Sequence, residues 1–270
     1  MIRNAASPFD ILASTYDADF TVSHIGRLQR ERVWSFLQAL LSTKHGSLKI
    51  LEINCGTGED AVRLSALGHT VIASDASASM IEKAREKLES CHIDVPVEFV
   101  VCSFSELSIR FVNEQFDLVF SNFGGLNCID RPALEQLNKD LSFLIKPGGH
   151  LFFVIMSRCC LWEIFYYGIK GKLRTAFRKF RKSVNFTVNG SRMTVHYYSP
   201  VDIKKIFAKS FSCLQQHPVG LFIPPSYLEK RFELRPRWLD RLNKLEKKWG
   251  YSFLSPFADH YCMNFKKPAK

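Results

Sequence analysis

The sequence lacks most of the signals that mark secreted, membrane-spanning or metal-binding proteins. None of its eight cysteines belongs to a CxxC pair, and no cysteine–histidine cluster has the spacing of a zinc site. The first ten residues, MIRNAASPFD, have no apolar core that would resemble a secretory signal. The most apolar stretch, Leu151 to Ile169, is interrupted by Arg158 and Glu163, so we expect no transmembrane helix. These absences favour a cytoplasmic protein with free thiols and no metal.

The composition is that of a folded protein, and its charge is uneven. Apolar residues make up 46% of the 270 positions, including 23 phenylalanines, so the chain can bury one sizeable core. Residues 157–250 hold 20 Lys and Arg against 6 Asp and Glu, a net charge of +14, while the remainder holds 17 against 20. Such a basic segment favours an acidic small molecule, an anionic membrane surface or nucleic acid as a partner.

Strands and helices alternate through the middle of the chain. Five short apolar runs predict strands at 49–53, 69–74, 97–102, 116–122 and 150–156, with amphipathic helices between them and a turn at KPGG (146–149). Two more strands are expected near the C-terminus, at 213–223 and 259–265. Strands separated by helices form parallel sheets that are covered on both faces. We therefore predict an α/β protein with a doubly wound, mostly parallel seven-stranded sheet.

The pattern changes after Met156. Residues 157–182 are basic, aromatic and helical in pattern, and two alternating runs then flank Asn189-Gly190, a strong hairpin signal. We expect this helix-plus-hairpin insertion to act as a substrate lid, together with the loop 221–230. The prediction is a single domain over 1–270, made of an N-terminal helical cap (1–47), a cofactor-binding core (48–156), the insertion (157–198) and closing elements (199–270).

A short turn, LEINCGTGEDA at 51–61, carries the clearest binding signal. Gly56, Gly58 and Ala61 satisfy the pattern G-x-G-x-x-[G/A], and Asp75 follows at the end of the second strand, where a carboxylate grips ribose hydroxyls. The pattern indicates an adenosine-type ligand without choosing among NAD, FAD and S-adenosylmethionine.

The acidic residues of this turn favour one of these ligands. Glu52, Glu59 and Asp60 would oppose a pyrophosphate, since two like charges about 4 Å apart cost about 1–4 kcal/mol. S-adenosylmethionine carries a sulfonium and an ammonium and has no phosphate, so it avoids that cost.

Four segments in succession resemble the motifs of the Rossmann-fold (class I) S-adenosylmethionine-dependent methyltransferases, small-molecule type: LEINCGTGEDA, VIASDAS, FDLVFSN and LIKPGGHLFFVIM. The resemblance covers roughly residues 48–156, and Asn54 stands where the family has its first glycine. Asparagine tolerates a positive φ better than other non-glycine residues, so we expect the turn to survive. The leader FDILASTYDADF also resembles the family's cofactor-covering segment.

The resemblance implies a set of residues around S-adenosylmethionine. Asp75 would bind the ribose, Tyr16 would cover the cofactor, and Arg27 or Arg32 would reach its carboxylate. The full implied set is Tyr16, Glu52, Asn54, Gly56, Gly58, Asp75, Ala76, Met80, Ser103, Phe104, Ser121 and Asn122.

The methyl acceptor and any general base are poorly specified. Candidates that would orient or deprotonate the acceptor are Asn127, His196 and Tyr197, with Tyr198 and His260 as further side chains of suitable chemistry. The basic segment favours a small acidic or lipid-like acceptor.

Three other functions stay open at this point. Tyr166 and Lys170 have the Y-x-x-x-K spacing of short-chain dehydrogenases, although the glycine turn lies in a different place. An RNA or DNA methyltransferase would use the basic segment, but SNFGGLN after the fourth strand lacks the prolines of base-modifying enzymes. A non-catalytic adenosine-ligand-binding protein would agree with Asn54 in the glycine turn.

Overall fold

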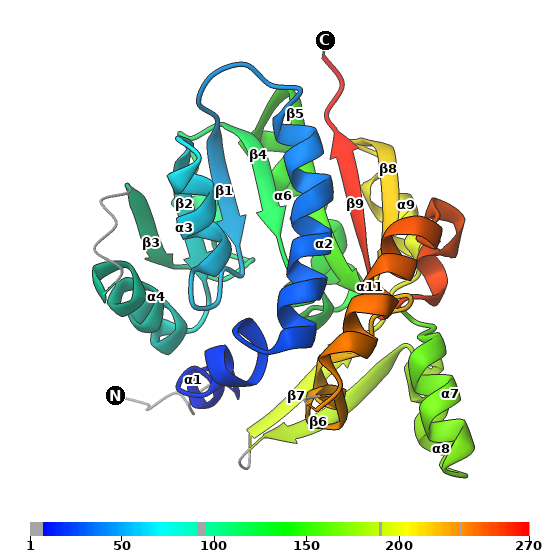
Figure 1. Ribbon diagram of the computed structural model, residues 1–270. Coiled ribbons are helices and arrows are strands. Elements are labelled where there is room, and N and C mark those ends of the chain that lie inside the picture. Colours follow the sequence, from blue (N-terminus) through cyan, green and yellow to red (C-terminus); the bar gives the residue numbers. More distant parts are fainter. Residues whose placement is uncertain (1–7, 91–95, 189–190, 233, 270) are drawn as a thin grey trace.

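The computed structural model describes residues 8–90, 96–188, 191–232 and 234–269. It contains a seven-stranded sheet in the order β3-β2-β1-β4-β5-β9-β8, in which β1 to β5 are parallel and β9 runs antiparallel to both its neighbours (Figure 1). The strands are β1 (Lys49–Ile53), β2 (Thr70–Asp75), β3 (Val97–Val101), β4 (Phe116–Ser121), β5 (Ile145–Met156), β8 (Ser212–Val219) and β9 (His260–Lys266). The predicted doubly wound, mostly parallel sheet is confirmed.

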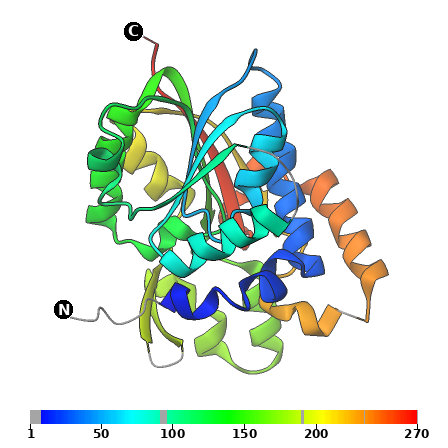
Figure 2. The same cartoon turned by 90° about the vertical axis from the view of Figure 1, so that its left-hand side faces the viewer.

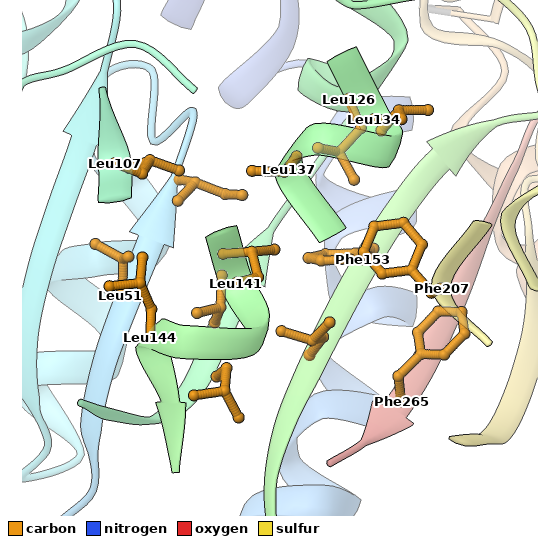
Figure 3. Packing of buried hydrophobic residues seen from close by; sticks show 14 of the residues in the cluster. Leu51, Leu107, Leu126, Leu134, Leu137, Leu141, Leu144, Phe153, Phe207 and Phe265 are labelled. Carbon is orange, nitrogen blue, oxygen red and sulfur yellow. The ribbon is translucent and has the colours of Figure 1, made fainter. Parts of the chain in front are cut away.

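Helices cover both faces of the sheet, which explains why the strands are apolar on both sides. In β1, Leu51 belongs to the hydrophobic cluster on one face and Ile50 to the cluster on the other. Leu137 and Leu141 of α6 lie in the first cluster, and Figure 3 shows them against the sheet. The helices of that face are α5 (Leu107–Arg110), α6 (Arg131–Leu144) and α9 (Pro200–Phe207); those of the other are α2 (His24–Leu41), α3 (Glu59–Ala66) and α4 (Ala78–Ser90).

Local sequence sets the start of several helices. The Asp130 side chain accepts a 3.0 Å hydrogen bond from the backbone N–H of Ala133, and Pro132 occupies the first turn of α6. Ser199 and Asp202 form a reciprocal capping box at α9. These caps fix where the helices leave the carboxyl ends of the strands.

The predicted turn at KPGG is wrong in detail. β5 already begins at Ile145, and its pairing with β4 jumps from Phe116↔Ile145 to Leu118↔His150. The residues between these pairs bulge out of the strand, with Gly148 at φ +77°. The glycine therefore serves a bulge inside the strand.

The segment after β5 folds beneath the carboxyl ends of the parallel strands (Figures 1 and 2). It contains α7 (Leu161–Ile169), α8 (Leu173–Ala176), η3 (Arg178–Arg181), β6 (Ser183–Val188) and β7 (Ser191–His196). β6 and β7 pair as an antiparallel hairpin from Ser183↔His196 to Val188↔Ser191, and the expected Asn189-Gly190 turn lies outside the described residues.

The remaining elements lie at the carboxyl ends of the parallel strands and beside α2. They are α1 (Pro8–Leu12), η1 (Asp17–Thr21), η2 (Gly125–Cys128), η4 (Ser226–Leu228), α10 (Glu229–Phe232), α11 (Pro236–Trp249) and η5 (Ser252–Phe257). α1 lies beside the hairpin, and α11 packs on α2 through Leu239, Leu242 and Ile25 (Figure 1).

Across the described ranges, no helix combines the length and apolar character needed to span a bilayer. The seven cysteines in those ranges are free thiols.

Candidate functional site

A cavity of about 980 Å³ lies beyond the carboxyl ends of the parallel strands, where ligands bind in open α/β sheets. This volume is near the top of the roughly 300–1,000 Å³ range of small-molecule sites. The turns after β1, β2 and β4 form one end, and the insertion with the start of β9 forms the other. Residues predicted from the sequence that line it are Tyr16, Asn54, Gly56, Asp75, Ala76, Met80, Ser103, Phe104, Asn122 and Tyr197.

Asn54 fixes the backbone conformation of the turn after β1. This residue has φ +56°, in the left-handed region that asparagine tolerates, and Gly56 follows at φ +54°. The Asn54 amide donates to the backbone oxygen of Asn122 (2.9 Å) and accepts from the Ser121 hydroxyl (2.5 Å). The side chain that replaces the family's first glycine thus ties the end of β1 to the end of β4. Ser121 serves this link and does not line the cavity.

Asp75 is fixed at the cofactor end of the cavity by two backbone groups. Its two carboxylate oxygens accept 2.9 Å hydrogen bonds from the N–H groups of Gly56 and Ser77. Burial raises the pKa of this carboxyl, and in the described ranges no Lys or Arg lies within ion-pair distance of it. Each oxygen keeps a further lone pair, so the carboxylate can still accept hydrogen bonds from a ligand.

Glu52 and Gly58 support the turn from behind, outside the cavity wall. Glu52 is 1% exposed, its Oε2 has no hydrogen-bond partner, and burial followed by the Asp60 charge raises its pKa well above the usual range. Gly58 has φ +76°, and a Cβ there would lie 2.8 Å from the Phe99 ring. Gly58 therefore permits close packing of α3, and Glu52 is a buried carboxyl that needs a cation to ionise without large cost.

The acidic turn is more neutral than the sequence suggested. Asp60 is buried and accepts hydrogen bonds from Arg30, from Trp34 Nε1 (2.6 Å) and from Asn122 Nδ2 (2.8 Å). Lys87 lies 3.2 Å from Glu59. Glu59 and Asp60 are therefore paired with cations from α4 and α2 that are distant in sequence, so the turn presents less net negative charge than a count along the chain indicates.

The N-terminal segment lies over the turn after β1. The Tyr16 ring lies 3.8 Å from the position of a Cβ on Gly56, and burial raises the pKa of its hydroxyl to about 12. Neither Arg27 nor Arg32 lines the cavity; Arg32 donates to the Glu246 backbone oxygen (3.3 Å). The arginine that reaches the turn is Arg30, which the sequence reading did not select.

Two of the three acceptor-side candidates lie outside the cavity. The Asn127 amide makes hydrogen bonds with the Met156 N–H (2.8 Å), the Met156 oxygen (3.2 Å) and the His196 oxygen (2.6 Å). Asn127 therefore joins β5 to β7, and His196 supplies only its backbone to this link. Tyr197 lines the cavity, with burial raising its pKa.

The possible dehydrogenase pair also lies away from the cavity. Lys170 Nζ donates to the Tyr166 hydroxyl (2.6 Å), and neither side chain belongs to the cavity wall. The pair is a surface contact across one helical turn, so it has no access to a cofactor bound at Asp75.

Buried ion pairs form the end of the cavity opposite Asp75. Lys179 lies 3.0 Å from Asp259 and 3.2 Å from Glu163, and Arg178 lies 3.0 Å from Glu163. Burial opposes ionisation of Asp259, but Lys179 and His260 together outweigh burial and hold the pKa of this carboxyl far below its usual range. At this end of the cavity, the buried carboxylates are paired with cations of the protein itself.

His260 completes this end of the cavity. Its Nδ1 lies 3.2 Å from Asp259 Oδ2, and its ring lines the cavity beside Phe123, with ring centroids 5.6 Å apart. Because β9 pairs with β5, His260 lies opposite Met156 at the end of β5. A histidine directly after an aspartate at the start of the last strand was the available signal.

Comparisons with known proteins agree with this geometry. A family described as a methyltransferase domain matches residues 50–149. Demethylmenaquinone methyltransferase from Clavibacter sepedonicus is 31% identical over 53% of this chain and 54% of its own, so the chain spans about half the length of that relative. The fold resembles the PH0226 protein from Pyrococcus horikoshii (TM-score 0.59, 18% identity, 94% of this chain and 98% of that one).

A structure of a DhpI–SAH complex matches with a TM-score of 0.58 and 18% identity, over 97% of this chain and 94% of that one. SAH denotes S-adenosylhomocysteine, the product that remains when S-adenosylmethionine has given up its methyl group. The strand order, the turn after β1 and the family match all lead to the same assignment. Residues 50–149 match the methyltransferase domain family, and the sheet around them has the fold of the class I S-adenosylmethionine-dependent methyltransferases.

Proposed function

We propose that this chain transfers a methyl group from S-adenosylmethionine to a small, largely apolar acceptor held between the cofactor turn and the insertion. The observation that carries the proposal is the single cavity, which runs from Gly56 and Asp75 to Tyr197 and His260. One continuous space of about 980 Å³ has room for a nucleoside cofactor and a second molecule next to it.

The cofactor fits the chemistry of the residues at the first end. Asp75 is anchored by backbone N–H groups and would accept hydrogen bonds from the ribose hydroxyls. The Glu52 carboxyl lies behind the turn and does not line the cavity, but its charge when ionised would favour a positively charged ligand from a distance. Asn54, Gly56, Tyr16 and the other cavity-lining members of the predicted set would surround the remainder.

The acceptor end favours an apolar molecule over an acidic one. The cations in its wall, Arg178 and Lys179, are already paired with Glu163 and Asp259, so they offer little net charge to an acidic group. Apolar side chains dominate the rest: Ile129, Leu137, Met156, Phe186, Met193 and Val195. A relative named demethylmenaquinone methyltransferase supports this choice, whereas other relatives are named for malonyl-[acyl-carrier protein] and for tRNA 5-carboxymethoxyuridine.

His260 is the group best placed to receive a proton from the acceptor. When bound, S-adenosylmethionine supplies an electrophilic methyl group and leaves as neutral S-adenosylhomocysteine. The acceptor atom forms the new bond to carbon, and the proton it loses goes to Nε2 of His260, the ring nitrogen turned away from Asp259. Asp259 Oδ2, which lies 3.2 Å from Nδ1, would stabilise the imidazolium by its charge, and the aromatic wall excludes water.

Two measurements test the proposal in order. Isothermal titration should show S-adenosylmethionine and S-adenosylhomocysteine binding to the full chain, and NADH not binding. A screen of apolar phenols, quinols and lipid-like acids, read by release of S-adenosylhomocysteine, should then find turnover, with cationic and highly charged acceptors inactive. Tight binding of NADH alone would overturn the cofactor assignment. Turnover confined to RNA or to highly charged metabolites would overturn the acceptor class.

A further inference from the structure

The insertion has an outer surface of unusual character. α7 turns Glu163 inward, where it is buried against Arg178 and Lys179, and Trp162 donates to the Phe222 backbone oxygen (2.9 Å). Its outer side carries Leu161, Phe165 and Ile169, spaced by four residues and 47%, 65% and 73% exposed. A surface helix normally turns polar residues outward, so this apolar stripe needs an explanation.

Exposed apolar side chains also occur in the two elements that follow α7. Leu173, Phe177 and Phe180, on α8 and η3, are 60%, 47% and 48% exposed. Of the 22 large apolar side chains that are exposed in the described ranges, these six fall within 20 consecutive residues. We call the outer surface formed by these six residues and the exposed cations Lys170, Lys172, Arg174, Arg181 and Lys182 the docking face.

The charge of the docking face is of one sign. Glu163 is the sole acidic residue between 161 and 182, and it is buried and paired. The five exposed cations form no ion pair within the part of the chain that the structure describes. A second copy of this chain would present the same positive surface and be repelled, whereas an anionic surface would be attracted.

The position of this face connects it with the cavity. α7 and α8 project below the sheet at the carboxyl ends of the strands (Figures 1 and 2). Glu163, Arg178 and Lys179 of the same segment line the cavity from inside. We propose that the docking face binds the surface of an anionic lipid bilayer, with its apolar side chains in the interfacial layer and its cations at the lipid headgroups. An apolar acceptor would then reach the cavity from the bilayer.

Vesicle flotation of the full chain tests this without any assay of methyl transfer. The chain should float with vesicles of phosphatidylcholine and phosphatidylserine and bind vesicles of phosphatidylcholine alone several-fold more weakly. The double variant Phe165→Asp/Ile169→Asp should lose about tenfold or more in vesicle affinity. Phe143→Asp is the matched control, because Phe143 is 75% exposed on α6, and it should bind like the unmodified chain.

A second arm tests the charge. Lys170→Glu/Lys172→Glu should abolish the preference for phosphatidylserine, whereas Lys139→Glu on α6 should preserve it. Thermal melting and binding of S-adenosylhomocysteine by every variant establish that the fold persists. Three results would overturn the proposal: no flotation of the unmodified chain, equal loss in the Phe143 control, or a dimer in sedimentation that the Phe165/Ile169 variant dissociates. A failure here would leave the proposed methyl transfer untouched, because that proposal is read by cofactor binding and turnover.

Discussion

The two ends of the cavity differ in whether their buried carboxylates are paired with a cation of the protein. At the cofactor end, Glu52 and Asp75 have no cation within ion-pair distance among the described residues, and burial raises the pKa of both. At the acceptor end, Glu163 and Asp259 are paired with Arg178 and Lys179. An unpaired buried carboxylate is costly, so it persists where a ligand supplies the missing positive charge. The comparison supports the proposal that a cationic ligand binds at the first end and a neutral, apolar one at the second.

The largest effect should come from unpairing the acceptor end. Lys179→Met would leave Asp259 buried without its main cation, which we expect to lower the free energy of unfolding by about 3–5 kcal/mol. Urea denaturation measures this loss. Lys172→Met, an exposed lysine seven residues earlier, should change the same quantity by less than about 0.5 kcal/mol. Equal effects of the two substitutions would show that the buried pairs do not hold this end together.

The pH dependence of this pairing has a definite sign. Because the pKa of Asp259 is lowered in the folded state, the stabilisation it provides is fully present above its unfolded value near 4. It is lost as the pH falls below that value toward the folded pKa. The free energy of unfolding of Asp259→Asn should therefore be lower than that of the unmodified chain at pH 7. The two values should approach each other at strongly acidic pH.

The next largest effect should come from His260→Gln, which we expect to lower kcat. Removal of a general base costs about 10²–10⁴-fold in kcat, and the affinity for S-adenosylhomocysteine should stay unchanged because His260 lies at the other end of the cavity. His196→Gln is the control, since that half-buried histidine lies outside the cavity wall, and it should retain full activity. If the His196 variant lost the activity and the His260 variant kept it, the assignment of the base would be reversed.

These residues show what the sequence could and could not predict. Asp75, Asn54 and the strand order follow from local patterns, because the turn, the strand end and the apolar periodicity all lie within short segments. Arg30 and Trp34 reach Asp60 from a helix some 30 residues away, and their contact depends on how α2 packs across the sheet. Charge counted along the chain therefore overstated how acidic the turn is.

The acceptor end was harder to predict for the same reason. Its ion pairs join α7, η3 and the residue before β9, and the two partners of one pair, Lys179 and Asp259, are 80 residues apart in the chain. The high positive charge of residues 157–250 led to the prediction of a small acidic or lipid-like acceptor, whereas the proposal of an apolar acceptor rests on the pairing of Arg178 and Lys179 with Glu163 and Asp259. The exposed cations define an outer surface instead, and composition cannot distinguish these two places.

Asp75→Asn tests the cofactor end by affinity. Loss of charge-assisted hydrogen bonds to the ribose should weaken S-adenosylmethionine binding by about 2–3 kcal/mol, or roughly 30- to 150-fold. Isothermal titration measures this change. Ser103→Ala, whose hydroxyl bonds to Glu106 (2.6 Å) at the cavity rim, should change the same affinity by only a few-fold. Unchanged affinity in the Asp75 variant would remove the ribose assignment while leaving the fold intact.

Glu52→Gln should have the smallest effect of these substitutions. It tests the difference between the two ends of the cavity most sharply, because it should raise the stability of the cofactor-free protein and lower its affinity for the cofactor. The pKa of Glu52 is raised in the folded state, so ionisation destabilises the fold progressively as the pH rises above the unfolded value near 4.3. The neutral amide avoids this cost, so thermal melting of the cofactor-free variant at pH 7 should show a gain of about 1–3 kcal/mol that disappears near pH 4. S-adenosylmethionine should bind the same variant more weakly, since the buried negative charge that favours a cationic ligand is gone. A variant that is less stable at neutral pH, or that binds the cofactor equally well, would mean that Glu52 is an ordinary structural carboxyl and that the difference between the two ends does not concern the ligand.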